Sequence, residues 1–318
     1  MVIDYILHFK KGHGGAMAEF LMKPKVDFAF KEIMADEKAR TGFLSAVLNI
    51  QPEDVKETRI LNANLRQEHI DDKLGILDVR LLLDNDREID IEIQLSELKV
   101  WADRSLFYLA KMLIEQIKPG DSYRVFKKCV NISILDFILF KDGPSVSSET
   151  PFYSCFHIRE DTHHFLYTDK MEFHVIELPK LPKGLTAGCS NLELWAKFIN
   201  AERKEDFVMI AQKDPYIESA YKKLQLISQD KDKRQEYEAR EKAIRDYSEM
   251  MLEAEERGWE KGMEKGMEKG MEKGILEGEY RKSVQVALDM LSQNFDVDII
   301  SQISRLPLEE VERLKPVH

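Results

Sequence analysis

Two neighbouring segments alternate strictly between apolar and polar residues, and this alternation constrains the fold more than any other feature of the chain. The segments are residues 74–81 and 88–95, and Asp84, Asn85 and Asp86 lie in the turn between them. A period of two predicts half-buried β-strands, and Asp and Asn tolerate the left-handed backbone that a three-residue hairpin loop needs. We therefore predict a hairpin with one apolar side. The residues expected to face the core are Leu77, Val79, Leu81, Leu83, Ile89, Ile91, Ile93 and Leu95.

The other side of this hairpin carries acids. If apolar residues oppose apolar residues, a three-residue loop places Leu83 opposite Arg87 and Asp78 opposite Glu92. Directly opposed side chains have Cβ atoms about 4.5–5.5 Å apart, so two ionised carboxylates there repel unless a cation lies between them. Hard oxygen ligands suit Mg²⁺ or Mn²⁺. The alternative is a solvated sheet face on which Glu88, Asp90, Glu92 and Gln94 keep an edge soluble, and the hairpin alone does not decide between the two.

Length and charge bound the class of protein. A chain of 318 residues accommodates one sizeable domain with an appendage, or two modest domains. A formal net charge of -11 argues against a protein that coats nucleic acid electrostatically, but not against an enzyme that cuts it. No apolar run approaches the roughly 20 residues that span a bilayer, so we expect no membrane segment.

Cysteine and histidine usage points to a reducing, cytoplasmic setting without a zinc site. Cys129, Cys155 and Cys189 stand far apart, with neither metal-ligand spacing nor an even disulfide set. The histidines show no zinc-ligand pattern either, and we expect most of them at the surface; they include His157, His163, His164 and His174.

The apolar spacing of residues 23–228 is typical of a folded domain. We expect residues 1–22, which precede it, to form a disordered leader. The apolar spacing predicts a helix over residues 28–48, broken near Asp36, and another over 101–117. Residues 55–62 predict a first strand, 129–139 a buried strand, and 152–158, 165–167 and 173–178 further strands; helices are expected at 192–201 and 214–227. This order describes an α/β or α+β fold with a central mixed sheet.

Residues 229–282 form a charged helix that runs into a repeat with glycine at every fourth position, from Gly258 to Gly278. Each glycine costs a helix about 1 kcal/mol relative to alanine, so the helix needs a partner against its small stripe. One interpretation is self-association through residues 229–282. The other is a tandem-duplicated, loosely ordered linker. Residues 283–318 recover apolar periodicity and predict three short helices, a protein-interaction module rather than a DNA-binding one because no basic face is visible.

Several short motifs occur in a fixed order along the chain. They are KVDFAFK at residues 25–31, ILDV at 76–79, IEIQ at 91–94, Arg104 with Tyr108, and the glycine-rich tail. This order resembles the Rpn family of recombination-promoting nucleases and transposases, within the PD-(D/E)XK nuclease superfamily, over roughly residues 23–278. The resemblance implies a restriction-endonuclease-like α/β core and a divalent-metal-dependent DNA endonuclease.

The resemblance also assigns roles. Asp78 and Glu92 match the two metal-binding acids, and the backbone carbonyl of Ile93 would complete the ligand set for Mg²⁺ or Mn²⁺. Gln94 takes the place of the superfamily lysine; its amide can orient a water but cannot accept a proton or carry positive charge.

Four further residues belong to the expected site as substrate contacts or supports. Arg104 and Tyr108 share a helix face, and Arg104 either contacts the scissile phosphate or forms an ordinary ion pair. Asp27 is either an additional acid near the metal or a helix-start residue beside Pro24, and Lys31 lies one turn after it.

Two functions stay open at this point. The first is a cytoplasmic Mg²⁺-dependent DNA endonuclease tied to recombination or a mobile element. The second is a catalytically degenerate scaffold that oligomerises through its helical tail and binds DNA or a protein partner. A DNA-binding regulator acting through residues 283–315 is a weaker third, because the flanks are acidic.

Overall fold

The structure is a computed structural model that describes residues 20–63, 78–97, 100–141, 151–186 and 188–315. The chain divides into two compact units, residues 1–244 and 245–318. Residues 1–19 of the expected leader and residues 74–77 of the first expected strand lie outside the described part. Within the described part, no helix is long and apolar enough to cross a membrane.

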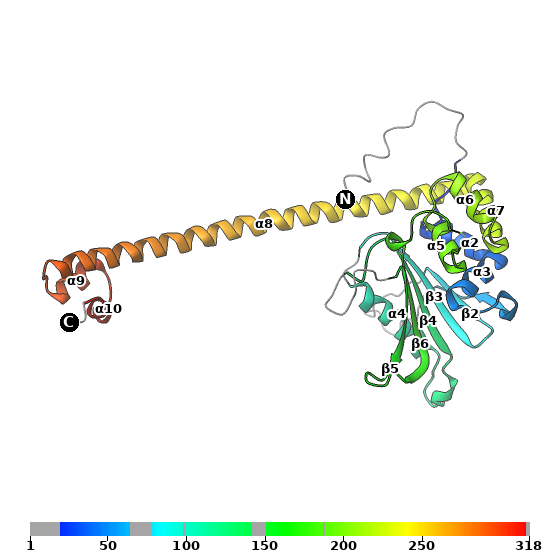
Figure 1. Cartoon of the computed structure of the whole chain (residues 1–318), viewed down its shortest axis with the longest axis horizontal. Helices are drawn as coiled ribbons and strands as arrows, with labels where there is room; N and C mark the ends of the chain where they lie inside the picture. The colour runs from blue at the N-terminus through cyan, green and yellow to red at the C-terminus, as the bar shows by residue number, and fades with distance from the viewer. Residues whose placement is uncertain (1–19, 64–77, 98–99, 142–150, 187, 316–318) are drawn as a thin grey trace, which may run out of the picture. The chain divides into compact units, whose positions relative to one another are not determined.

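The first unit is built on a mixed sheet of six strands (Figure 1). The strands are β1 (Thr58–Ile60), β2 (Val79–Leu83), β3 (Arg87–Gln94), β4 (Lys128–Leu135), β5 (Tyr153–Arg159) and β6 (Leu166–Glu177). Their order in the sheet is β1-β2-β3-β4-β6-β5. β3, β4 and β6 run parallel, while β1, β2 and β5 pair antiparallel with their neighbours. The predicted α/β architecture with a central mixed sheet is confirmed.

The predicted register of the β2–β3 hairpin is also confirmed. Leu83 pairs with Arg87 and Val79 with Ile91, and one further step along this register places Asp78 opposite Glu92. The backbone of Asp84 and Asn85 is left-handed, with φ of 49° and 57°, as the loop composition predicts.

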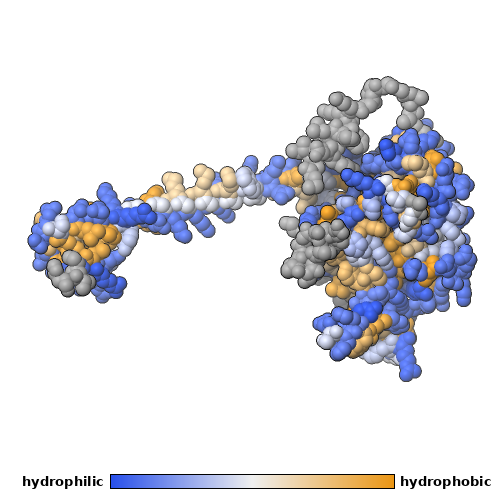
Figure 2. Space-filling view, viewed as in Figure 1, coloured by the Kyte–Doolittle hydropathy of each residue, from blue (hydrophilic) through white to orange (hydrophobic). Residues whose placement is uncertain are grey.

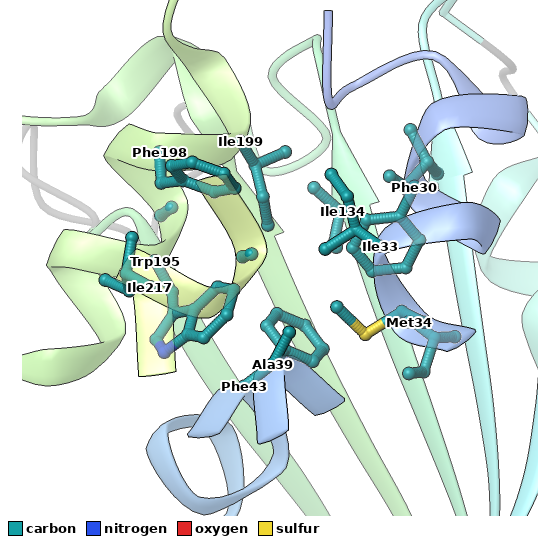
Figure 3. Close-up of a cluster of buried hydrophobic side chains, with 14 of the residues drawn as sticks. Phe30, Ile33, Met34, Ala39, Phe43, Ile134, Trp195, Phe198, Ile199 and Ile217 are labelled. Atoms are coloured by element: carbon teal, nitrogen blue, oxygen red, sulfur yellow. The ribbon is translucent and has the colours of Figure 1, made fainter. Parts of the chain in front are cut away.

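One face of the sheet packs against helices from both ends of the unit. These are α2 (Asp27–Ala35), α3 (Glu37–Leu48), α5 (Asn191–Asn200), α6 (Lys204–Ala211) and α7 (Pro215–Gln229). The expected break near Asp36 is present, and its carboxylate accepts a hydrogen bond from the Ala39 backbone N–H and caps α3. Aromatic rings join these helices in the core (Figure 3), where Phe43 lies 5.7 Å from both Phe30 and Trp195, centroid to centroid. Sequence periodicity did not predict α6.

The opposite face is covered by α4 (Trp101–Glu115). Beneath this helix Glu88, Asp90 and Glu92 are 5%, 0% and 1% exposed. Of the two alternatives left open for this hairpin, the solvated acidic face is therefore excluded for these three residues. The reason is that α4 packs its apolar side, including Trp101 and Leu109, against β4 and β6. In this position the helix also covers the polar side of the hairpin.

Ion pairs and hydrogen bonds compensate part of the charge on this buried polar face. The Arg80 guanidinium contacts Glu88 and lies 2.9 Å from the Glu115 carboxylate. The Gln116 amide donates to Glu88 and accepts from the Lys127 backbone N–H. These contacts fix the middle of the hairpin and leave its open end, at Asp78 and Glu92, to other partners.

Two details differ from the sequence prediction. The strands expected at 165–167 and 173–178 are parts of one long strand, β6 (Leu166–Glu177), because residues between them continue its pairing with β5. His174 is buried, at 2% exposure, rather than at the surface. Short 3-10 turns at Pro52–Asp54, Tyr123–Val125 and Leu178–Lys180 complete the unit.

The last long helix, α8 (Lys231–Ser292), begins on the first unit and continues through the glycine repeat. Tyr237 is buried, and its hydroxyl accepts a hydrogen bond from the Lys23 backbone N–H. The first of the three expected C-terminal helices is simply the end of α8, which packs with α9 (Val297–Ser304) and α10 (Leu308–Arg313) around Ala287, Ile300 and Val311.

Candidate active site

Asp78 and Glu92 face each other at the open end of the hairpin. The Asp78 backbone N–H donates to Glu92 Oε1 at 3.0 Å, and the Ile93 backbone N–H donates to Asp78 Oδ2 at 3.0 Å. The N–H and C=O of one strand residue point to the same side, so the Ile93 carbonyl also points towards the Asp78 side. The structure therefore brings together the three residues that the sequence singles out as metal ligands.

Asp90 is a third acid at this site that sequence reasoning assigned to solvent. Its Oδ2 accepts from Asn131 at 2.7 Å, while its Oδ1 is buried without a hydrogen-bond partner. Asn131 is held in turn by Ser133, and Ser133 by the Trp101 indole N–H. The signal that could have identified Asp90 is its position two residues before Glu92, which places both carboxylates on the same face of β3.

Burial raises the pKa values of all three acids, and nearby carboxylates add to the shift of each. For Asp90, burial is the largest cause and the charge of Asp78 adds to it, raising the pKa to about 8 against the hydrogen bond from Asn131. Burial and the charges of Asp90 and Asp78 hold the pKa of Glu92 well above its usual value. Burial also raises the pKa of Asp78, against the hydrogen bond from Ile93. The site thus concentrates negative charge that the protein only partly compensates.

A divalent cation fits this donor set. The groups that converge are carboxylate oxygens, the ligands that Mg²⁺ and Mn²⁺ prefer. Buried oxygens of Asp90 and Asp27 lack hydrogen-bond partners, and such orphan acceptors are costly unless something positive satisfies them. The raised pKa values of the neighbouring acids have the same physical origin.

Asp27 and Lys31 reach the site from the first and second turns of α2. Lys31 Nζ lies 3.3 Å from Asp78 Oδ1, and the Asp27 charge contributes to the raised pKa of Asp78. Asp27 is therefore close to the acids and is not simply an exposed helix-start residue. Its Oδ2 accepts a hydrogen bond of 2.7 Å from Arg240 Nε of α8. Sequence analysis missed Arg240, because nothing in its spacing distinguishes it from the other charges of that helix.

Gln94, Arg104 and Tyr108 occupy the rim. Gln94 Nε2 donates to Glu92 Oε2 at 3.3 Å. The exposed Arg104 guanidinium donates to the Tyr108 hydroxyl at 2.7 Å and lies 5.9 Å from the Trp101 ring centroid. Within the described residues Arg104 makes no ion pair with Glu92 or Asp78, although its charge acts on the pKa of Glu92. The aromatic rings position this guanidinium and leave its charge available.

The raised pKa of Asp90 makes a prediction for stability against pH. Between about pH 4 and pH 8 the folded protein holds the Asp90 proton and the unfolded chain releases it, so the free energy of unfolding falls as pH rises through this window. Asp90→Asn removes this contribution. We expect the variant to show a shallower slope in urea denaturation between pH 5 and pH 8 with EDTA present, and a gain at pH 8 on the order of a few kcal/mol.

The control is Asp86→Asn in the exposed hairpin loop, which should leave the wild-type slope unchanged. A slope that is identical in wild type and Asp90→Asn would show that Asp90 is ionised in the folded protein throughout, contrary to this electrostatic description.

Comparison with known proteins places this geometry in a family. The family model described as PD-(D/E)XK nuclease family transposase matches residues 24–254, which include every site residue described above. Neither a search of curated proteins nor a search of solved structures found a match. The match covers more than half of the chain, and the chain therefore belongs to the PD-(D/E)XK nuclease family transposases.

Proposed function

We propose that this protein is a divalent-metal-dependent DNA endonuclease that hydrolyses phosphodiester bonds in recombination or mobile-element biology. The observation that carries the proposal is the pair of carboxylates formed by the half-buried Asp78 and the buried Glu92, opposed at the open end of the hairpin with raised pKa values. A nuclease-type function is what membership of the family supports. The metal, the substrate and the individual residue roles are our inference.

Hydrolysis of a phosphodiester needs a polarised phosphoryl oxygen, an activated water and a stabilised leaving oxygen. Asp78, Glu92 and the Ile93 carbonyl would hold Mg²⁺ or Mn²⁺, which when bound polarises the phosphoryl oxygen and lowers the pKa of a coordinated water. Gln94, hydrogen-bonded to Glu92, can orient that water through its amide.

Lys31 offers the positive charge that Gln94 lacks. Its ammonium lies 3.3 Å from Asp78 Oδ1, and its side chain is 38% exposed, so it can reach either the acids or a bound phosphate. We infer that Lys31, on α2, takes over the charge-stabilising role that the superfamily lysine has at the position of Gln94.

Arg104 is the best candidate for a phosphate contact. It is exposed, it is stacked near Trp101 and Tyr108, and a guanidinium matches a phosphate with two parallel hydrogen bonds. Because the chain is acidic overall, with a net charge of -11, DNA binding must depend on such local cations. Tyr108 is a positioning residue for Arg104.

We also propose a cytoplasmic location, on the evidence of the cysteines. Cys129, Cys155 and Cys189 are all free thiols, and Cys155 is exposed. Exposed free thiols persist in reducing compartments.

A plasmid-nicking assay with Mg²⁺, Mn²⁺ or EDTA tests this function. Asp78→Asn and Glu92→Gln keep the shape of the site but remove metal-ligand charge, and we expect each to lower the rate at least about 100-fold. Lys31→Gln should lower the rate as well, and the double variant Lys31→Gln with Gln94→Lys should recover part of it, because a lysine then returns to the strand.

Asp86→Asn, on the exposed loop of the same hairpin, serves as the matched control and should cut at the wild-type rate. Cleavage that survives both Asp78→Asn and Glu92→Gln would reject the site. If wild type binds Mn²⁺ but cuts no DNA, the degenerate scaffold replaces the enzyme as the better description.

We further propose that the protein forms a homo-oligomer through residues 229–282. Each repeat places a glycine beside an exposed apolar side chain, as in Gly262 with Met263 and Gly266 with Met267. Figure 2 shows apolar side chains along the exposed surface of the long helix. A Cβ added at any repeat glycine would meet no atom within 4 Å. The occupant that fits is a second copy of α8. The methionines of one copy can pack against the glycines of the other. Each Glu-Lys pair has no net charge, so identical copies do not repel each other.

The four-residue period also predicts the kind of contact. Ridges that follow the i±4 rows of both helices interdigitate at a crossing angle of about −50°. Two copies would therefore cross at the repeat and would not wind into a long coiled coil, which needs a period of 3.5.

Light scattering of the full chain after size exclusion tests this assembly. Wild type should elute as an oligomer, and Gly266→Leu with Gly270→Leu should shift it to monomer, because bulky side chains keep the backbones apart. Gly→Ala at the same two positions is the control and should still associate. A monomeric wild type at tens of micromolar would overturn the proposal.

A further inference from the structure

A second polar cluster lies on the sheet face opposite the acidic site, where β5 pairs with β6. The register sets Cys155 opposite His174 and His157 opposite Glu172, so a Cys-x-His motif faces a Glu-x-His motif on one side of the ladder. Glu172 and His174 pair with Val130 and Ile132 on β4, both members of the core beneath α2 and α3. The cluster is therefore separated from Asp78 and Glu92 by the sheet itself.

The ligand atoms of this cluster are gathered closely. One atom each from Cys155, Glu172 and His174 lies within 4.8 Å of the others. His157 Nδ1 lies 3.9 Å from Cys155 Sγ, and His157 Nε2 lies 3.1 Å from Glu172 Oε2. Tetrahedral zinc bonds of about 2.0–2.3 Å separate neighbouring ligand atoms by roughly 3.3–3.8 Å. Shifts of an ångström or less would thus convert the cluster into a metal site.

We propose that Cys155, Glu172 and His174 bind Zn²⁺, with His157 or a water as the fourth ligand. Thiolate, imidazole and carboxylate together form a borderline-soft donor set that suits zinc and not magnesium. The site is distinct in position and in chemistry from the oxygen-only site at Asp78 and Glu92. It does not depend on the proposed nuclease activity.

The surroundings prepare His174 for metal binding. The Tyr153 hydroxyl lies 2.8 Å from His174 Nδ1 and 3.3 Å from the Val47 carbonyl oxygen. When the tyrosine donates to Val47, His174 Nδ1–H can donate to the tyrosine oxygen, which leaves a lone pair on Nε2 for a metal. Metal-bound histidines generally donate their second ring N–H to an oxygen in this way.

The two carboxylate oxygens of Glu172 have different partners. Its Oε1 lies 2.6 Å from His174 Nε2, where a metal would replace the shared proton, and its Oε2 contacts the Lys128 ammonium. Lys128 can keep that contact while Oε1 binds the metal. Glu172 and His174 are buried, whereas Cys155 is exposed, so the site is built into the sheet and opens to solvent on one side.

The position of the site indicates its role. Among the strands that the structure describes, β5 lies at the edge of the sheet beside β6, and its register shifts between His157 and Ile158 and again between Ile158 and Arg159. A metal bound across the two strands would fix the pairing just before this irregularity. The expected role is structural, because metal binding contributes directly to the stability of the fold that forms the site.

Titration of the full chain with Co²⁺, after removal of bound metal with a chelator, tests the site. Wild type should develop a thiolate-to-cobalt charge-transfer band that saturates near one equivalent and disappears when Zn²⁺ is added. Cys155→Ser should abolish the band and weaken Zn²⁺ binding, measured against a chromophoric chelator, by at least about tenfold. Because Cys155 is exposed, this variant should fold normally.

Two controls separate this site from the rest of the chain. Cys189→Ser should leave the band unchanged, which assigns the thiolate to Cys155. Asp78→Asn with Glu92→Gln should also leave it unchanged, so a failure of the nuclease proposal and a failure of the zinc proposal give different results. No band in wild type, or the same band in Cys155→Ser, would overturn the zinc site.

Discussion

The burial of like charges on one side of the β2–β3 hairpin is the constraint on which the site depends. Asp90 and Glu92 are buried and Asp78 is half-buried beside them, and burial together with nearby carboxylates raises the pKa values of all three. Carboxylates that repel in a poorly solvated environment are costly to the fold. They are useful where a cation completes the arrangement, and we infer that the rest of the site is organised for that cation.

The fold holds this arrangement from three directions. β4 supplies Asn131, which fixes Asp90, α4 closes the polar face, and the second turn of α2 brings Lys31 to Asp78. The start of α8 adds Arg240 through its ion pair with Asp27. All of these side chains lie in the first unit of the chain, residues 1–244.

The hairpin could be predicted from sequence because its parity and its loop length leave one register in which apolar side chains face one another. The break at Asp36 was equally predictable, since its side chain caps the second helix. What surrounds the hairpin was not predictable. The burial of Glu88, Asp90 and Glu92 depends on how α4 docks, and α4 is separated from the hairpin by residues with no strong pattern.

Contacts between distant segments could not be predicted either, because they too depend on how separate elements pack together. Arg240 lies more than 200 residues from Asp27, and no local pattern links them. Cys155 and His157 have no zinc-like spacing with Glu172 and His174 along the chain, and only the antiparallel pairing of β5 and β6 aligns them. The pattern that could have been found is the repeated x-Phe-His element, Cys-Phe-His and Glu-Phe-His, once both segments are assigned to adjacent strands.

Anomalous diffraction from crystals soaked in Mn²⁺ tests the central claim most directly. The account predicts an anomalous peak between the carboxylates of Asp78 and Glu92, within coordination distance of the Ile93 carbonyl oxygen. A structure in which both carboxylates keep their backbone N–H partners, with no anomalous peak between them at millimolar Mn²⁺, would contradict it.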